Sequence, residues 1–336
     1  MSFVLNGWYQ AAWSDEVGRA LLQRWICGQP VCLYRTRDGA PVALADRCPH
    51  RKYPLSLGRL DGDIIECNYH GYRIDAAGSC VGVAEQSEQP RAAVHRYPLV
   101  ERDSVLWLWP GDPAQADPDL IPDLRWISDP DWTHVRGLVP LGARQELLVE
   151  NLLDLSHETF LHPTTIGNAA VAGTPIEVSG EGTTVRFSRR MLGITPPPFY
   201  VKSMGLTAPA DRWQDGEFYA PGVFLLHIRL APAGTQEPEG YHMEVFHGMT
   251  PATQSECHDF WALGRDYLTG DAGLSRFQQE QQLAVMAEDV AALEVQEAMY
   301  ATGGATMPES SIKGDVAALR SRRVMRRMLA AEQSAS

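Results

Sequence analysis

Short apolar segments of strand length alternate with turn residues through the first third of the chain. Residues 42–45 and 64–67 are two such segments, and each follows a tight-turn pair, Asp38-Gly39 and Asp61-Gly62. A further strand pattern at 105–109 runs into a Pro- and Asp-rich connector that continues to about residue 131. The pattern predicts a β domain at residues 1–112 and a second domain at residues 113–336.

The second domain contains an apolar pattern of helical period. Leucine and valine recur along residues 147–155, and Asn151 and Asp154 share one face of the predicted helix, with His157 on the same side one turn later. Pro163 disfavours helical geometry at the residue before it, so the helix should end near His162. The two histidine rings can then converge.

A second helical pattern covers residues 281–297. Asp289 lies three residues after Met286 and four before Leu293, so it belongs to the apolar stripe, whereas Glu288 and Glu294 should point more toward solvent. A buried carboxylate without a partner is unfavourable, and a metal ion is one such partner. A hydrogen-bonded or interface aspartate is the alternative.

Charge and composition narrow the classes of function. The net charge of −13 disfavours a nucleic-acid partner, which requires a basic surface. No apolar run is long enough to cross a membrane, and the N-terminus lacks the basic start and apolar core of a signal peptide, so we expect a cytoplasmic protein. Four of the cysteines are scattered singly along the chain, which indicates buried thiols rather than disulfides. They are Cys27, Cys32, Cys80 and Cys257.

Two short motifs combine thiolate and imidazole ligands. Cys48-Pro-His50 and Cys67-Asn-Tyr-His70 each contain one cysteine and one histidine and lie in predicted loops between strands. In a Rieske [2Fe–2S] cluster two cysteines bind one iron and two histidines bind the other, so each loop can contribute one ligand to each iron. A structural Cys₂His₂ zinc site is the alternative, although zinc knuckles usually begin with two closely spaced cysteines.

A second metal site is expected where His157 and His162 converge. Two histidines and one carboxylate form the facial triad of non-haem Fe(II) oxygenases, which leaves coordination positions open. Asp289 is the candidate carboxylate. A His-x₄-His pair alone is weak evidence for a metal, but an iron–sulfur electron donor on the same chain strengthens the interpretation.

Together these residues resemble the Rieske non-haem iron oxygenases over nearly the whole chain. The likeness is greatest to oxygenase components of the vanillate O-demethylase type, with dicamba O-demethylase and toluenesulfonate methyl-monooxygenase as cousins. The resemblance implies an α+β fold, with an all-β Rieske domain and a helix-grip catalytic domain that has an antiparallel sheet and C-terminal helices. It also implies a homotrimer and a separate flavin- and ferredoxin-containing NAD(P)H reductase.

The resemblance also implies residue roles. Cys48, His50, Cys67 and His70 would hold the [2Fe–2S] cluster, and His157, His162 and Asp289 would hold the mononuclear iron. Asp154 matches an acidic residue that bridges a Rieske histidine of one subunit to an iron-ligand histidine of its neighbour, and Asn151 matches a residue near the iron. One departure from the family is Tyr72, which stands where many members have tryptophan.

The reaction expected from this resemblance is a monooxygenase reaction that uses O₂ and NAD(P)H. Our prediction is oxidative O-demethylation of a methoxylated aromatic acid, giving the phenol and formaldehyde. Ring or methyl hydroxylation, or N-demethylation, of another aromatic anion is the alternative, and a Rieske electron-transfer protein without mononuclear iron is a more remote one.

Three residues on two predicted strands are candidates for substrate binding. Alternation along residues 223–230 places His227 and Arg229 on one face, and Arg229 could bind a carboxylate or sulfonate through two hydrogen bonds. His247, on a strand at residues 243–249, matches a carboxylate-contacting histidine of the dicamba enzyme. The alternative for each is a structural polar residue of the sheet. The sequence does not define the substrate or the position of oxidation.

Overall fold

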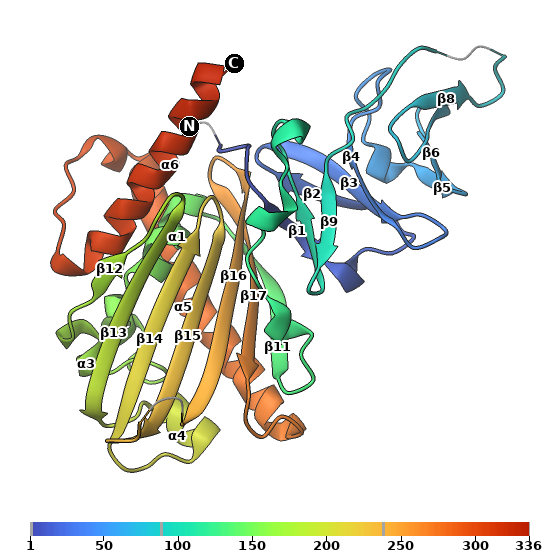
Figure 1. Cartoon of the computed structure of the whole chain (residues 1–336). Coiled ribbons are helices and arrows are strands. Elements are labelled where there is room, and N and C mark those ends of the chain that lie inside the picture. Colours follow the sequence, from blue (N-terminus) through green and yellow to red (C-terminus); the bar gives the residue numbers. More distant parts are fainter. Residues whose placement is uncertain (1–2, 88–89, 237–238, 336) are drawn as a thin grey trace. The chain divides into compact units, whose positions relative to one another are not determined.

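The computed structural model describes residues 3–87, 90–236 and 239–335 (Figure 1). The chain forms two compact units, one of Met1–Ile121 with Thr250–Gln254 and one of Pro122–Met249 with Ser255–Ser336. The predicted domain boundary after residue 112 lies within the first of these units. It stays a prediction about domain organisation.

The first unit is built from three small antiparallel sheets. Their strand orders are β1-β10-β9, β2-β3-β4 and β5-β6-β7-β8. The strands are β1 (Tyr9–Trp13), β2 (Leu22–Ile26), β3 (Gln29–Arg35), β4 (Pro41–Ala45), β5 (Arg59–Asp61), β6 (Ile64–Glu66), β7 (Tyr72–Ile74), β8 (Cys80–Val83), β9 (Leu99–Arg102) and β10 (Val105–Leu108). An apolar core of this unit packs around Leu55 and Ile65 and includes Cys48 and Cys67. The predicted all-β character of this region is confirmed.

The second unit contains one antiparallel sheet of seven strands. Its order is β11-β17-β16-β15-β14-β13-β12, so all neighbours except β11 and β17 are consecutive along the chain. The strands are β11 (Thr133–Leu141), β12 (Glu177–Ser179), β13 (Thr184–Ile194), β14 (Ala210–Tyr219), β15 (Val223–Pro232), β16 (Tyr241–Thr253) and β17 (Glu256–Arg265).

Helices cover one face of this sheet. Figure 1 shows α5 behind the strands and α6 near the β12–β13 side. The helices are α1 (Gln145–Leu153), α2 (Glu158–Leu161), α3 (Ala169–Gly173), α4 (Pro198–Met204), α5 (Ala272–Ala301) and α6 (Val316–Ala335). The main core lies between the helices and the sheet. This is the predicted α+β fold. In the described part of the chain, no helix is long and apolar enough to cross a membrane.

The predicted helix that was to end near His162 is interrupted. Helix α1 ends at Leu153, and Asp154 leaves helical geometry with φ −120° and ψ 83°. Its carboxylate accepts a hydrogen bond from Ser156 N at 3.0 Å and so begins a short 3₁₀ turn, Leu155–His157, which leads into α2. An aspartate side chain competes with helical hydrogen bonds in this way. The expected end before Pro163 is confirmed, because α2 stops at Leu161.

Candidate functional site

Two loops of the first unit carry the Cys/His motifs on similar backbones. In the first loop Cys48 N donates to Tyr53 O at 2.8 Å, and Lys52 N donates to Cys48 O at 2.9 Å. The second loop repeats both bonds at nearly the same spacing, with Cys67 as its first residue and Gly71 in the place of Lys52. Both turning residues have positive φ, 62° at Lys52 and 71° at Gly71. The chain therefore presents its two ligand motifs in matching conformations.

The four candidate ligands of these loops are arranged as two pairs. The Nδ1 atoms of His50 and His70 are 3.1 Å apart and their rings are exposed, whereas both cysteines are buried. Burial raises the pKa of the Cys48 thiol to about 11, and the adjacent Cys67 thiol adds to this rise. Binding to a cation deprotonates such thiols. Two paired cysteines and two paired histidines fit the two differently ligated irons of a Rieske cluster.

Tyrosine rings surround the histidine pair. Tyr72 stacks on His50 with ring centroids 5.0 Å apart and an interplanar angle of 10°. The ring centroids of Tyr69 and His70 are 3.9 Å apart, and the Tyr69 side chain is exposed. Tyr72, the departure noted in the sequence, is therefore in direct contact with a candidate cluster ligand. It can influence the environment of that ligand without replacing it.

The second unit brings His157, His162 and Asp289 together. One ligand atom of each lies within 4.8 Å of the others, so these three residues form a group that could hold a metal ion. The Nε2 atoms of His157 and His162 are 3.5 and 3.2 Å from Asp289 Oδ1. Two imidazoles and one carboxylate are the donor set of the facial triad in non-haem iron oxygenases. The residues present therefore fit a mononuclear iron.

Each histidine of this group has a partner for its other ring nitrogen. His157 Nδ1 is 2.7 Å from the carbonyl oxygen of Asp154, which favours a proton on Nδ1 and leaves Nε2 for a metal. His162 Nδ1 is 2.6 Å from Glu288 Oε2. Burial alone lowers the pKa of His162, but hydrogen bonds and charges from Asp289 and Glu288 outweigh it and raise that pKa above its ordinary value. Such outer contacts orient metal-binding imidazoles.

Glu288 is more exposed than Asp289, whose side chain is 16% exposed, as predicted, but the prediction missed a contact that Glu288 makes. Its side chain is 39% exposed, but its carboxylate reaches His162, whose side chain is fully buried. The periodicity of α5 places Glu288 beside the apolar stripe rather than within it, and the contact comes from the length of the glutamate side chain. No motif in the sequence marks this contact.

Asn151 and Asp154 both lie beside the triad. Asn151 Nδ2 donates to Asp289 Oδ1 at 3.1 Å, while its own buried Oδ1 has no hydrogen-bond partner. Asp154 lines a second cavity, on which Asn151 and His157 also border. Asn151 therefore contacts the triad through its amide nitrogen. The bridging role of Asp154 stays a prediction.

A largely apolar cavity opens onto the triad. Its walls come from α1, α4, β15, β16 and α5, and include Leu148, Leu152, Phe199, Phe224, Leu226, Ile228, Met243, Val245, Val285 and Met286. His247, which is 5% exposed, is a polar group in this lining, and its Nδ1 lies 2.9 and 3.1 Å from the two carboxylate oxygens of Asp259. The cavity thus combines a metal-binding triad, apolar walls and a His–Asp pair. Aromatic small molecules fit this composition.

The other two substrate candidates lie outside the cavity lining. Phe224, Leu226 and Ile228 of β15 line it, and alternation directs His227 and Arg229 to the opposite face of the sheet. His227 Nδ1 pairs with Glu244 at 2.5 Å, and the Arg229 guanidinium lies 3.9 Å from the centre of the Trp213 ring. The expectation that His227 and Arg229 contact a substrate held beside the triad is therefore wrong.

Comparisons with known proteins cover both units. The family model described as "Rieske [2Fe-2S] domain" matches residues 7–98, and the one described as "Vanillate O-demethylase oxygenase C-terminal domain" matches residues 141–331. The vanillate O-demethylase oxygenase subunit of Pseudomonas sp. (strain HR199 / DSM 7063) is 34% identical over 99% of this chain and 97% of its own length. The oxygenase component of dicamba O-demethylase from Stenotrophomonas maltophilia is 36% identical over 80% of each chain.

Comparison with solved structures agrees with the sequence comparisons. The crystal structure of dicamba monooxygenase bound to 3,6-dichlorosalicylic acid superposes with a TM-score of 0.95 at 33% identity and covers 99% of each chain. A structure of that enzyme with non-haem iron and dicamba has a TM-score of 0.88 at 32% identity and covers the whole of both chains. The resemblance therefore extends over both compact units.

Proposed function

Since the chain belongs to the Rieske non-haem iron oxygenases, in the group with the vanillate O-demethylase oxygenase C-terminal domain, we propose that it demethylates a methoxylated aromatic acid. As an oxygenase of this family it uses a Rieske [2Fe–2S] cluster and a mononuclear non-haem iron. The observation that carries the proposal is the convergence of His157, His162 and Asp289 in the lining of a largely apolar cavity.

The ligand assignments form the first part of the proposal. Cys48 and Cys67 hold one iron of the cluster, and His50 and His70 hold the other. His157, His162 and Asp289 hold the mononuclear iron. When bound, the cluster supplies single electrons and the mononuclear iron supplies open coordination positions for O₂.

The overall reaction balances as an oxidative demethylation. One methyl aryl ether, one O₂, one NAD(P)H and one proton give the phenol, formaldehyde, water and NAD(P)⁺. Hydroxylation of the methyl C–H bond yields a hemiacetal, which loses formaldehyde as its O–CH₂ bond to the ring oxygen breaks. The apolar walls of the cavity exclude bulk water and hold the ring with its methoxy group toward the triad.

His247 provides the polar contact for the acid group. Its Nδ1 lies against Asp259, so its Nε2 is directed away from that carboxylate and is free to meet a ligand. Arg212 also lines the cavity, but it is engaged by Glu158 and Tyr200. His247 is therefore the side chain that we assign to the acid group. Among the described residues of the cavity lining, this leaves no arginine free to bind a carboxylate through two hydrogen bonds.

Because Arg212 is already paired, the cavity lining also favours a second candidate reaction, in which the substrate is neutral. A neutral aromatic ether or an N-methyl amide needs only one hydrogen bond from the protein, and the cavity offers one at His247. Among the relatives, the chloroacetanilide N-alkylformylase oxygenase component of Rhizorhabdus wittichii (strain DC-6 / KACC 16600) is 31% identical over 80% of this chain. Oxidative N-dealkylation of such a substrate is therefore the alternative reaction.

The partners belong to the proposal as well. Its relatives are oxygenase components and subunits, so the chain works with proteins that supply electrons. We propose a flavin- and ferredoxin-type NAD(P)H reductase as the donor, a homotrimer as the assembly, and the cytoplasm as the location. Asp154 then connects the mononuclear site with the cluster of a neighbouring subunit.

Formaldehyde release per O₂ consumed tests the reaction. The iron-loaded protein with a surrogate reductase is given methoxylated benzoic acids, their neutral methyl esters and N-methyl anilides. About one formaldehyde per O₂ with an acid supports the proposal, and the same ratio with only neutral compounds supports the alternative. Oxygen uptake that gives a ring-hydroxylated product and no formaldehyde would refute both. A His247→Phe variant should lose most of the preference for an acid over its methyl ester.

A further inference from the structure

A cluster of buried polar side chains lies next to the two histidines of the triad. Glu158, Arg189, Tyr200, Arg212 and Gln214 are each at most 2% exposed. Burying charged groups carries a large desolvation penalty, and a buried ion pair is often no more stable than apolar residues of similar size. Stability alone therefore does not explain this cluster.

The contacts within the cluster converge on the carboxylate of Glu158. Arg212 Nη2 donates to Glu158 Oε2 at 3.2 Å, and Gln214 Nε2 donates to Glu158 Oε1 at 3.0 Å. Arg212 Nη2 also lies 2.8 Å from Tyr200 Oη, and its Nη1 donates to the carbonyl of Ile166 at 3.2 Å. Strand β14 thus holds both oxygens of the carboxylate, and its arginine also binds the loop that follows α2.

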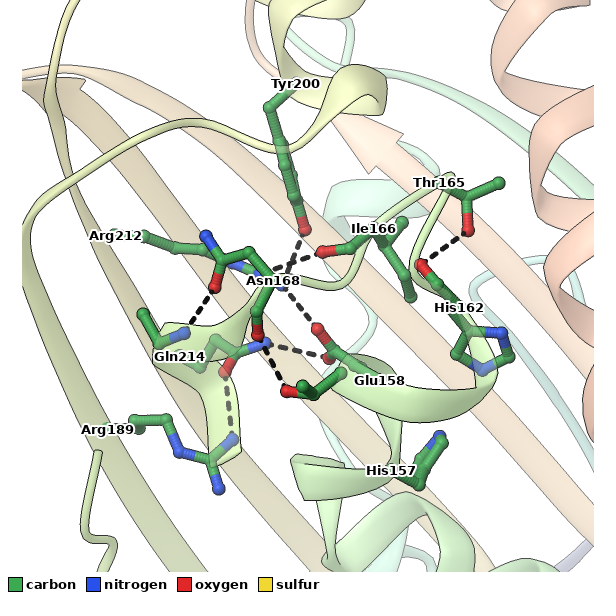
Figure 2. A network of polar contacts seen from close by, with 12 residues as sticks. His157, Glu158, His162, Thr165, Ile166, Asn168, Arg189, Tyr200, Arg212 and Gln214 are labelled. Atoms are coloured by element: carbon green, nitrogen blue, oxygen red, sulfur yellow. Dashed lines mark hydrogen bonds and ion pairs between the residues drawn. The ribbon is translucent and has the colours of Figure 1, made fainter. Parts of the chain in front are cut away.

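This arrangement fixes the chain on both sides of His162. Glu158 directly follows His157, and its carbonyl accepts a hydrogen bond from His162 N at 3.2 Å. After His162, the loop returns so that Gly167 N donates to His162 O at 3.1 Å, next to the Ile166 carbonyl that Arg212 binds. Figure 2 shows the two imidazoles on one side of the short helix and the polar cluster on the other.

The short helix cannot hold this geometry by itself. Helix α2 consists of Glu158–Leu161 only, and a single helical turn is unstable without outside contacts. The rings of His157 and His162 nevertheless lie 5.3 Å apart with their Nε2 atoms near one oxygen of Asp289. Their separation must therefore come from contacts outside the helix.

We propose that the Glu158–Arg212 pair is a positioning device that sets the separation of the two metal-binding histidines. It makes no contact with the metal and acts through the backbone of residues 157–167. The inference rests on the proposed metal role of His157, His162 and Asp289. It assigns a task to two buried charges that the reaction itself does not use.

Cobalt(II) binding tests the proposal without any turnover. The full chain keeps its [2Fe–2S] cluster, and the mononuclear site is stripped with a chelator and titrated with Co²⁺ while its d–d absorption is followed. Glu158→Gln preserves size but removes the charge that Arg212 binds. We expect Co²⁺ affinity to fall about 10-fold or more, as it does when outer partners of metal ligands are lost, with cluster absorption unchanged.

A double variant separates positioning from stability. In Glu158→Leu with Arg212→Met both charges are replaced by apolar side chains, which should restore thermal stability to the level of the unmodified protein. If the pair positions the histidines, Co²⁺ affinity stays low although stability recovers. Glu217→Gln is the matched control, because Glu217 lies on the same strand and pairs with Arg186 at 3.0 Å outside the cavity lining. It should bind Co²⁺ like the unmodified protein.

Two results would overturn the inference in different ways. Co²⁺ affinity within twofold of the unmodified protein in folded Glu158→Gln would overturn the positioning role alone, as would recovery of affinity in the double variant. If the unmodified protein binds Co²⁺ no better than a His157→Ala variant, the proposed metal site itself fails, and the inference fails with it.

Discussion

The contact between Glu288 and His162 leads to a quantitative prediction. Glu288 Oε2 lies 2.6 Å from His162 Nδ1, a length typical of a charge-assisted hydrogen bond, and it fixes the ring so that Nε2 faces Asp289. Loss of such an outer partner typically weakens metal binding 10–100-fold. Because the glutamate side chain is 39% exposed and its charge is screened by solvent, we expect the lower end for Glu288→Gln, about 10-fold or about 1.4 kcal/mol.

The assay is an anaerobic Fe²⁺ titration of the metal-stripped, cluster-containing protein at pH 7. Glu280→Gln is the matched control, because Glu280 is an exposed glutamate on the same helix and its loss removes the same charge. A change below twofold in Glu288→Gln, or an equal change in both variants, would refute the reasoning. The second outcome would show that the net charge of α5, and not the contact with the histidine, controls affinity.

Three further predictions concern Asp154, His227 and Glu297. Asp154→Asn should keep both iron centres but stop electron transfer between them, and normal single-turnover oxidation of the reduced cluster would contradict the bridge. His227→Gln should leave kcat/KM within about twofold, because its side chain pairs with Glu244 on the face away from the cavity; a larger loss would restore it as a substrate contact. Glu297→Gln should lower stability by about 1–2 kcal/mol at pH 7, measured by urea unfolding. The Arg144 guanidinium holds the pKa of Glu297 below its ordinary value. The stability that Glu297 contributes should therefore be complete above about pH 4.3 and disappear as the pH falls through its folded-state pKa. A stability difference between the two proteins that persists in acid would contradict this prediction.

Local motifs explain why much of the site could be predicted. His157 and His162 are five residues apart on one short segment, and the effect of Pro163 on its neighbour correctly marked where the helical conformation ends. Asp289 is distant in sequence, but it was detectable because a carboxylate within an apolar helical stripe needs a partner. Motif spacing and helical period carry this information without knowledge of the fold.

The mistaken assignments share a physical cause. Alternation correctly places His227 and Arg229 on one face of β15, but it does not say which face of the sheet borders the cavity. That choice depends on where the helices pack. The face that carries His227 and Arg229 also carries Val223 and Leu225, so apolar residues occur on both faces of the strand and the pattern alone does not identify the face that borders the cavity.

Contacts between distant polar side chains were also beyond the sequence. Arg212 and Gln214 stand on a strand with no motif around them, and Glu158 resembles any helical glutamate. The break of the helix at Asp154 depends on a side-chain hydrogen bond that competes with a regular helix by a small free energy. These features become visible only when β14 and the 157–167 segment are placed together.

The count of iron and acid-labile sulfide in the protein and in Asp289→Ala tests the central claim most directly. Two centres on one chain predict about three irons and about two sulfides per chain in the unmodified protein. The variant should hold about two irons and about two sulfides, keep its cluster absorption and lose turnover. Equal iron content in the two proteins, or loss of the cluster in the variant, would contradict two separate iron centres with Asp289 as a ligand of only one.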